Sequence, residues 1–229
     1  MERYVILAAG GSSKRMGTER PKQFLDLSGK PLIVHTMEAF FRFDNTVRFV
    51  IALHPTMREL YDALVEPFVG EMQVTIVDGG AERFHSVQNA LVEVPMGSLA
   101  AVQDAVRPFV TNDLLQRCFE TAEKLGNAIP AVPVIDSIRE ITSNGSTALD
   151  RHKLRAVQTP QCFRSDILKR AYEQPFDPTF TDDASVAERF GETINLVDGD
   201  IGNFKITTQE DFSRARALLI DQHRSQPLH

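Results

Sequence analysis

The chain has 229 residues, 42% of them hydrophobic and 24% charged, which are ordinary values for a globular α/β domain and exclude a disordered chain. The formal net charge of −6 disfavours a general nucleic-acid or anionic-membrane surface. No apolar run approaches the roughly 20 residues that a membrane-spanning helix needs, so we expect no membrane partner.

The first predicted element is an apolar strand that leads into a glycine-rich, basic loop. Residues 4–9 form a continuous apolar run, which is typical of a strand buried on both faces of a parallel sheet. The strand ends at Gly10 and Gly11, and the loop after it carries Arg15 and Lys22. Open α/β sheets bind ligands beyond the carboxyl ends of their strands, glycine backbone approaches phosphate oxygens closely, and basic side chains neutralise phosphate charge. We therefore expect a nucleoside triphosphate to bind here.

The spacing of the loop excludes two common phosphate motifs. Gly17 follows Gly11 one residue too late for a P-loop, and Ser12 stands where a dinucleotide fingerprint needs its second glycine. What remains is L-A-A-G-G-x-x-x-R-M-G, followed by P-K-Q-F and G-K-P-L. This pattern resembles the signature loop of the sugar-nucleotide pyrophosphorylase and nucleotidyltransferase superfamily, which implies a Rossmann-like, doubly wound sheet. The alternative is an ordinary glycine-rich turn with solvated basic residues.

Strands and helices alternate up to residue 134, which predicts a mostly parallel α/β sheet flanked by helices, with right-handed crossovers. The periodicity of apolar residues gives strands over residues 47–53, 74–77, 99–102 and 127–134. It gives helices over residues 31–41 with Pro31 at the first helical position, over 57–68 and 81–94, and from a Thr111 cap to residue 125.

Residues 136–156 interrupt this alternation. Two strand-like segments flank residues 143–146, whose Asn-Gly dipeptide is a strong hairpin signal. A hairpin with so few core residues cannot bury itself alone, so we expect a protruding β-arm that packs on another copy of the chain.

The remaining elements complete a single domain over residues 1–222, with a tail over 223–229 that has no pattern. They are helices over residues 165–172, 182–190 and 209–220, and strands over 193–197 and 205–207.

Four polar clusters end predicted strands, at residues 10–22, 78–86, 103–107 and 203–207, and strand ends on one side of a parallel sheet converge on one cleft. Six motifs occur in order after the loop: V-D-G-G-x-E-R-x-x-S-V, D-A-x-R-P, P-A-V-P-V-x-D-S-I, T-P-Q-x-F, T-D-D-A-S and N-x-K-I-T. Together they resemble the 2-C-methyl-D-erythritol 4-phosphate cytidylyltransferase family of the non-mevalonate isoprenoid pathway, over nearly the whole chain.

The resemblance implies that the 4-phosphate of methylerythritol phosphate attacks the α-phosphorus of CTP and releases pyrophosphate, with Mg²⁺ or another divalent cation as cofactor. The attacking phosphate is already anionic near neutral pH, so the reaction requires no general base. Its barrier lies in bringing two anions together in line and in stabilising the charge on the α-phosphoryl oxygens and the leaving group.

The resemblance also implies roles for individual residues. Arg15 and Lys22 stabilise the transition state, Arg151 and Lys205 grip and aim the methylerythritol phosphate, and Asp104 is the Mg²⁺ ligand. Nucleotide binding is implied for Ala8, Ala9, Gly10, Gly11, Gly80, Arg83, Ser86, Asp104 and Ala105. Substrate binding is implied for Ser137, Arg151, Thr159 and Lys205. The plain alternatives are solvated surface charges, a simple turn at the Gly79-Gly80 pair, and a helix cap at the aspartate.

The family further implies a homodimer in which the arm brings Arg151 and Ser137 to the neighbouring site.

The chain departs from the usual family pattern at Ala81, Gln103, Val106 and Ser137. Val106 also resembles the ribitol 5-phosphate cytidylyltransferases, a sister family that remains the alternative. A catalytically silent nucleotide-binding or scaffold protein is the alternative from another class.

The sequence lacks the motifs that zinc binding and acyl transfer require. The sequence has no H-E-x-x-H motif and no Cys/His cluster for zinc, and no G-x-S-x-G elbow for acyl transfer. Its two cysteines, Cys118 and Cys162, form no C-x-x-C pair, which indicates a reduced, cytoplasmic protein.

Overall fold

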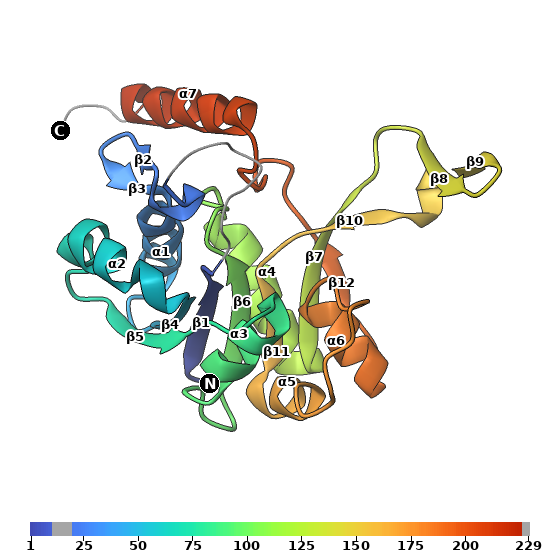
Figure 1. Ribbon diagram of the computed structural model, residues 1–229, viewed down its shortest axis with the longest axis horizontal. Coiled ribbons are helices and arrows are strands. Elements are labelled where there is room, and N and C mark those ends of the chain that lie inside the picture. The colour runs from blue at the N-terminus through green and yellow to red at the C-terminus, as the bar shows by residue number, and fades with distance from the viewer. Residues whose placement is uncertain (11–19, 226–229) are drawn as a thin grey trace.

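A mixed sheet of eight strands lies at the centre of the computed structural model, which describes residues 1–10 and 20–225 (Figure 1). The strand order is β10-β7-β11-β6-β1-β4-β5, and β12 pairs with β7. The pairs of β1 with β4 and β6, of β4 with β5 and of β12 with β7 are parallel, which confirms the predicted α/β sheet. The strands are β1 (Arg3–Ala8), β4 (Arg48–Leu53), β5 (Gln73–Asp78), β6 (Leu99–Asp104), β7 (Asn127–Pro133), β10 (Arg155–Val157), β11 (Gln161–Arg164) and β12 (Leu196–Asp198).

Helices cover both faces of the sheet, because its central strands are apolar on both sides. Along β1, Val5 and Leu7 belong to one buried cluster, and Tyr4 and Ile6 belong to the other. The first cluster includes buried residues of α1 (Leu32–Phe43), α2 (Arg58–Leu64) and α4 (Asn112–Leu125). The second includes residues of α3 (Arg83–Leu91), α5 (Ser165–Ala171) and α6 (Asp183–Phe190). This two-sided burial places the carboxyl end of β1 in the middle of the fold.

Two strands that the sequence analysis missed make the sheet mixed. β11 runs antiparallel to both β6 and β7, and β10 runs antiparallel to β7. The short strands β2 (Asp26–Leu27) and β3 (Lys30–Pro31), which pair with each other, were also missed. Pro31 precedes α1 in an extended conformation, so its placement at the first helical position was wrong by one residue.

Two predicted elements differ from the structure. The helix predicted over residues 57–68 is divided into α2 and flanking 3₁₀ turns, and Pro67, which has no N–H to donate, lies in the second turn. No strand forms over residues 205–207, where the Ile206 N–H donates to the Val106 carbonyl at 3.0 Å. The helix cap was right: the Thr111 hydroxyl accepts from the Leu114 N–H at the start of α4.

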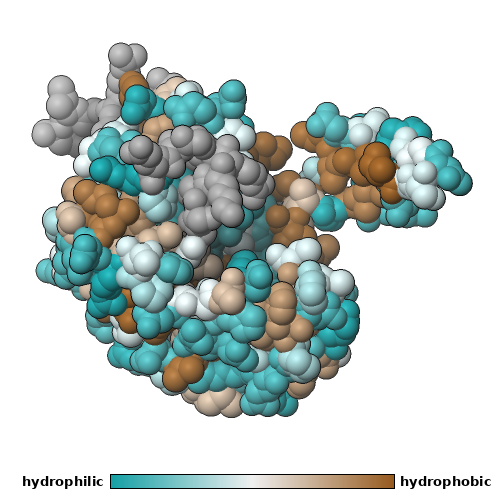
Figure 2. Space-filling view, in the orientation of Figure 1, coloured by the Kyte–Doolittle hydropathy of each residue, from teal (hydrophilic) through white to brown (hydrophobic). Residues whose placement is uncertain are grey.

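The predicted hairpin exists and projects from the body of the protein (Figure 1). It consists of β8 (Ile138–Thr142) and β9 (Gly145–Leu149), and the Ile141 side chain is 82% exposed. Figure 2 shows hydrophobic side chains gathered on the visible face of this arm. The predicted arm segment 136–156 runs too far at its carboxyl end, because Arg155 and Ala156 pair with β7 in the main sheet.

The final helix, α7 (Gln209–Ser225), lies across one end of the fold on a third buried cluster (Figure 1). The cluster joins Phe212, Ala215 and Leu219 to Val106 and Ile206. The helix is longer than predicted, so residues 223–225 of the expected tail are helical. No helix within the described ranges is long and apolar enough to cross a membrane.

A capping box fixes the start of α7 immediately after the segment that carries Lys205. The Asp211 carboxylate accepts from the N–H groups of Thr207 at 2.8 Å and Thr208 at 2.9 Å, and the Thr208 hydroxyl accepts from the Asp211 N–H at 3.1 Å. Partial burial alone would raise the pKa of Asp211, but these hydrogen bonds outweigh it and lower the pKa. The stabilisation from this carboxylate is therefore present at neutral pH and is lost as the pH falls through the lowered pKa.

We predict that Asp211→Ala lowers the free energy of unfolding by about 1 kcal/mol near neutral pH, because it removes the acceptor for these N–H groups. Urea unfolding of wild type and variant, at about pH 7 and about pH 3, measures the difference, which should shrink at the lower pH. A difference that stays constant between the two conditions would show that the carboxylate charge contributes nothing.

Candidate active site

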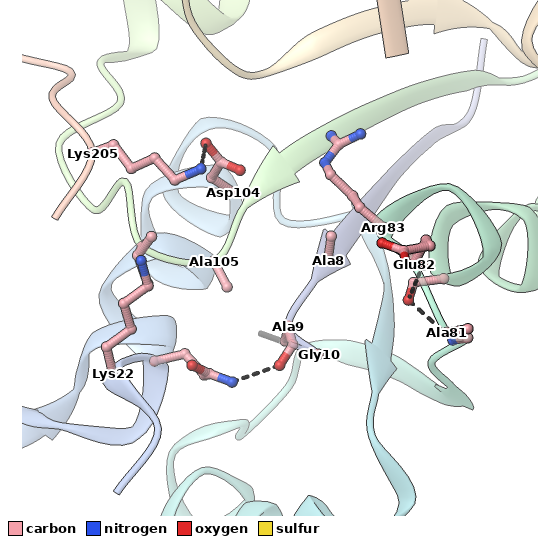
Figure 3. Close-up of a pocket in the computed structure, with 14 residues that line it drawn as sticks. Ala8, Ala9, Gly10, Lys22, Ala81, Glu82, Arg83, Asp104, Ala105 and Lys205 are labelled. Carbon is pink, nitrogen blue, oxygen red and sulfur yellow. Dashed lines mark hydrogen bonds and ion pairs between the residues drawn. The ribbon is translucent and has the colours of Figure 1, made fainter. Parts of the chain in front are cut away.

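A cavity of about 410 Å³ opens at the carboxyl ends of β1 and β6, beside the start of α3. Figure 3 shows Lys22, Asp104 and Lys205 on one side of the β1 end and Ala81, Glu82 and Arg83 on the other. The described residues that line it are Ala8, Ala9, Gly10, Lys22, Gln23, Gly80, Ala81, Glu82, Arg83, Ser86, Asp104, Ala105, Val106 and Lys205. Strand ends separated by about a hundred residues of sequence thus meet around one space, as expected for an open α/β sheet.

The end of β1 forms the floor of the cavity. The Ala9 N–H donates to the Ala52 carbonyl of β4 at 3.0 Å, and the side chain of Gln23 donates to the Ala9 carbonyl at 2.5 Å (Figure 3). Gln23 is buried, and it follows Lys22 in a short 3₁₀ turn, Lys22–Phe24. The anchoring of Gln23 therefore carries Lys22 to the rim of the cavity.

A tight turn before α3 forms a second wall. The Gly80 N–H donates to the Ser86 hydroxyl at 3.0 Å, and this hydroxyl donates to the Glu82 carbonyl at 3.1 Å. A Cβ atom on Gly80 would lie 2.2 Å from the Cβ of His85, a distance that real Cβ atoms do not adopt. Glycine is therefore required at this position by the packing of the turn against α3.

Asp104 lies at the centre of a charged group on the opposite wall. Its Oδ2 atom is 3.0 Å from Arg107 Nε and 3.2 Å from Lys205 Nζ. Burial alone would raise the pKa of Asp104, but Lys205 and Arg107 outweigh it and lower the pKa, so the carboxylate is ionised at neutral pH. Arg107 also donates to the Asn203 carbonyl at 2.7 Å, which ties the Lys205 segment to the end of β6.

Arg83 stands on the wall formed by α3, where its guanidinium is paired with a buried carboxylate. Its Nη1 and Nη2 atoms donate to Oδ1 and Oδ2 of Asp183, at 3.0 and 2.5 Å. Burial would lower the pKa of Arg83, but the charge of Asp183 more than reverses this and raises it. Arg83 is therefore a permanently charged donor in the cavity wall.

The structure places three of the expected substrate-binding residues away from this cavity. Ser137 and Arg151 lie on the exposed arm, where the Arg151 guanidinium donates to the Ile135 carbonyl. Thr159 is buried behind Asp104, and its hydroxyl accepts from the Asp104 N–H at 3.1 Å. Two further expected residues, Gly11 and Arg15, lie outside the described residues.

Several lining residues were not assigned a role from the sequence. Gln23 follows Lys22 in the quoted P-K-Q-F motif, and Val106 lies in the quoted D-A-V-R-P motif. Glu82 stands between the expected Gly80 and Arg83. The motifs could therefore have located these residues, but an apolar side chain or an amide in a motif carries no chemistry that would single it out.

The charged groups of the cavity suit a polyanion that carries a metal cation. The cations Lys22 and Lys205 can hold phosphate oxygens, and the Asp104 carboxylate can bind a cation that the phosphates bring with them. The described residues contain no group of three His, Cys, Asp or Glu side chains that could hold a metal by themselves.

Comparisons with known proteins agree over nearly the full length. A family model described as 2-C-methyl-D-erythritol 4-phosphate cytidylyltransferase matches residues 3–221. The protein of that name from Bacteroides thetaiotaomicron is 42% identical over 219 residues, which cover 96% of this chain and 100% of that protein. The one from Porphyromonas gingivalis is 42% identical over 220 residues, which cover 95% of this chain and 98% of that protein.

Solved structures of the same kind share the fold. The 2-C-methyl-D-erythritol 4-phosphate cytidylyltransferase of Thermus thermophilus is 31% identical with a TM-score of 0.77, covering 95% of this chain and 98% of that chain. The one from Francisella tularensis is 26% identical with a TM-score of 0.78, covering 95% and 99%. The sequence matches the family model over nearly its full length, and the fold matches that of solved structures of the same name. The chain therefore belongs to the 2-C-methyl-D-erythritol 4-phosphate cytidylyltransferase family.

Proposed function

We propose that the protein transfers the cytidylyl group of CTP to 2-C-methyl-D-erythritol 4-phosphate and releases pyrophosphate. The observation that carries this proposal is the cavity in a member of this family where two lysines and an ionised Asp104 meet the end of β1 and the Gly80 turn, at the carboxyl edge of the sheet. An oxygen of the sugar phosphate attacks the α-phosphorus while the bond from that phosphorus to the oxygen of the leaving pyrophosphate breaks. The step needs no protein base, because the attacking oxygen is already an anion.

The chain's task in this step is to hold two anions in line and to offset their charge. Lys22, at the cavity rim, and Arg15 stabilise the charge that develops on the α-phosphoryl oxygens and the leaving group. Lys205 lies on the same side of the β1 end as Lys22 (Figure 3), beside Asp104, and holds the phosphate of the second substrate. The backbone of Ala8 to Gly10 and the Gly80 turn hold the nucleotide.

Asp104 fits the role of a Mg²⁺ ligand. A magnesium ion that arrives with a triphosphate needs few protein ligands, and one ionised carboxylate in the cavity wall supplies the hard oxygen that it prefers. When bound, the ion neutralises phosphate charge and orients the triphosphate. The ion pairs of this carboxylate with Arg107 and Lys205 both use Oδ2, so Asp104 would hold the ion beside two cations that already fix its side chain.

We further propose that residues 1–222 act as one domain that works as a homodimer in the cytoplasm. The arm supports the dimer, because two strands with exposed Ile141 and Leu149 cannot form a core alone and need a partner surface. In this arrangement Arg151 and Ser137, which lie outside the cavity of their own chain, serve the partner's site. The cytoplasmic location is supported by two buried cysteines that are both free thiols.

The proposed reaction is tested by pyrophosphate release from CTP and Mg²⁺, with methylerythritol phosphate compared against ribitol 5-phosphate. We expect turnover with methylerythritol phosphate and little with ribitol 5-phosphate. Faster release with ribitol 5-phosphate would reverse the substrate assignment, and no release with either compound would indicate a silent nucleotide-binding protein.

The shared site is tested by mixing two inactive variants, Lys22→Ala and Arg151→Ala. We expect each alone to lose about 100-fold or more in kcat, as for the loss of one preorganised charge, with Lys124→Ala on the surface of α4 as the control. If Arg151 serves the partner's site, mixed dimers contain one intact site, and activity should return to about a quarter of the wild-type value after subunit exchange. A mixture that stays inactive would place Arg151 in its own chain's site.

A further inference from the structure

Asp183 is a completely buried carboxylate that the reaction described above does not use. Its side chain is 0% exposed, and charged groups are rarely buried to this degree unless they are paired. It is the first residue of α6, on the far side of the sheet from Lys22 and close to the wall that carries Arg83. A charge this deep in the protein is expected to have a specific partner.

Capping of α6 does not explain why a carboxylate is buried at Asp183. The neighbouring residue, Asp182, caps α6 by accepting from the Ser185 N–H at 2.8 Å, and the Ser185 hydroxyl completes the capping box. Asp182 also accepts from the Gln161 side chain at 2.7 Å. Capping is therefore complete without Asp183, whose carboxylate points instead to the cavity wall.

Two side chains hold this carboxylate in one orientation. Both terminal nitrogens of Arg83 donate to its two oxygens, and the Tyr172 hydroxyl donates to Oδ1 at 2.7 Å. The fork of the guanidinium matches the carboxylate in this geometry, so the plane of the Arg83 head is fixed. The Tyr172 ring is itself held by stacking on Phe84, with 4.7 Å between ring centroids.

Arg83 is also the member of this group that reaches the cavity. Its side chain is 32% exposed and lines the same space as Asp104. One edge of the guanidinium is bound to Asp183, and no hydrogen bond from the other edges to another residue is seen within the described ranges. The paired carboxylate offsets the guanidinium charge, so the pair is better suited to donate hydrogen bonds to a neutral acceptor than to attract phosphate.

We propose that Asp183 and Tyr172 are positioning residues that hold Arg83 in the cavity wall, where Arg83 donates to the uncharged ribose or base of the bound nucleotide. This inference rests on the proposed function, since it assumes that the cavity binds CTP. It assigns a role to the second aspartate of the T-D-D-A-S motif that differs from that of the first.

The test measures the affinity for CTP with Mg²⁺, and separately for pyrophosphate, by calorimetry on wild type, Asp183→Asn, Arg83→Met and the double variant. We expect Asp183→Asn to weaken CTP binding by about 10-fold, as for a hydrogen bond to a charged group, and to leave pyrophosphate binding unchanged. In the Arg83→Met background the same substitution should have no further effect, because Asp183 acts through Arg83. In steady-state assays the KM for CTP should rise more than the KM for the second substrate.

Three results would overturn the inference: equal weakening by Asp183→Asn in both backgrounds, unchanged CTP affinity in folded Asp183→Asn, or a parallel loss of pyrophosphate binding. If Arg83→Met does not fold, the Tyr172→Phe variant tests the inference instead. We expect it to bind CTP more weakly and to bind pyrophosphate as wild type does. Asp177→Asn is the matched control, because it breaks a surface ion pair with Arg189 of α6, at 3.2 Å, away from the cavity. Wild type that binds no CTP would instead refute the proposed function.

Discussion

The ionised carboxylate of Asp104 is the point at which three segments of the chain are tied together. Its side chain pairs with Arg107 and Lys205, and its backbone N–H donates to the Thr159 hydroxyl. Asn203 closes the group, because its carbonyl accepts from Arg107 and its side chain donates to the Thr159 carbonyl. The end of β6, the segment before β11 and the segment before α7 are thus fixed relative to one another. Neutral pH keeps this network charged, since its cations lower the pKa of Asp104.

The pairing of Asp104 with Arg107 and Lys205 also explains how the cavity can accept two polyanions. A site built only of cations would repel itself in the absence of ligand, whereas one buried carboxylate between two cations stabilises the empty site. Lys205 is held at the cavity by its ion pair with Asp104 instead of extending into solvent. The opposite wall follows the same principle, because Arg83 is held by Asp183. On two sides of the cavity, therefore, a cation is paired with a carboxylate that fixes its position.

Much of the fold could be predicted from the sequence, because burial leaves a periodic pattern. The apolar run of β1 predicted burial on both faces, and Val5 and Ile6 belong to different clusters. Strands β10 and β11 were missed since they are only three and four residues long and are held by pairing rather than by an alternating pattern. The segment around Lys205 reads as a strand in sequence, but its contacts are with the residues after β6 and with α7.

The sequence predicted those site residues that lie in motifs at the ends of strands. It did not predict the contacts that depend on how distant segments pack together. Ala8, Gly80, Ser86, Asp104 and Lys205 all lie around one cavity, as the convergence of strand ends suggested. The partnership of Arg83 with Asp183 joins residues a hundred positions apart through the second buried cluster, and no local pattern signals it. The position of Thr159 behind the cavity wall likewise follows from the mixed sheet, which the sequence did not predict.

The most direct test of the role proposed for Asp104 is the Mg²⁺ dependence of turnover in Asp104→Asn, which keeps the shape of the side chain and removes its charge. We expect a loss of about 100-fold or more in kcat and a higher Mg²⁺ concentration for half-maximal rate, because the carboxylate that is proposed to bind the metal and that pairs with Lys205 loses its charge. A variant with wild-type turnover and wild-type Mg²⁺ dependence would contradict the central role of this carboxylate.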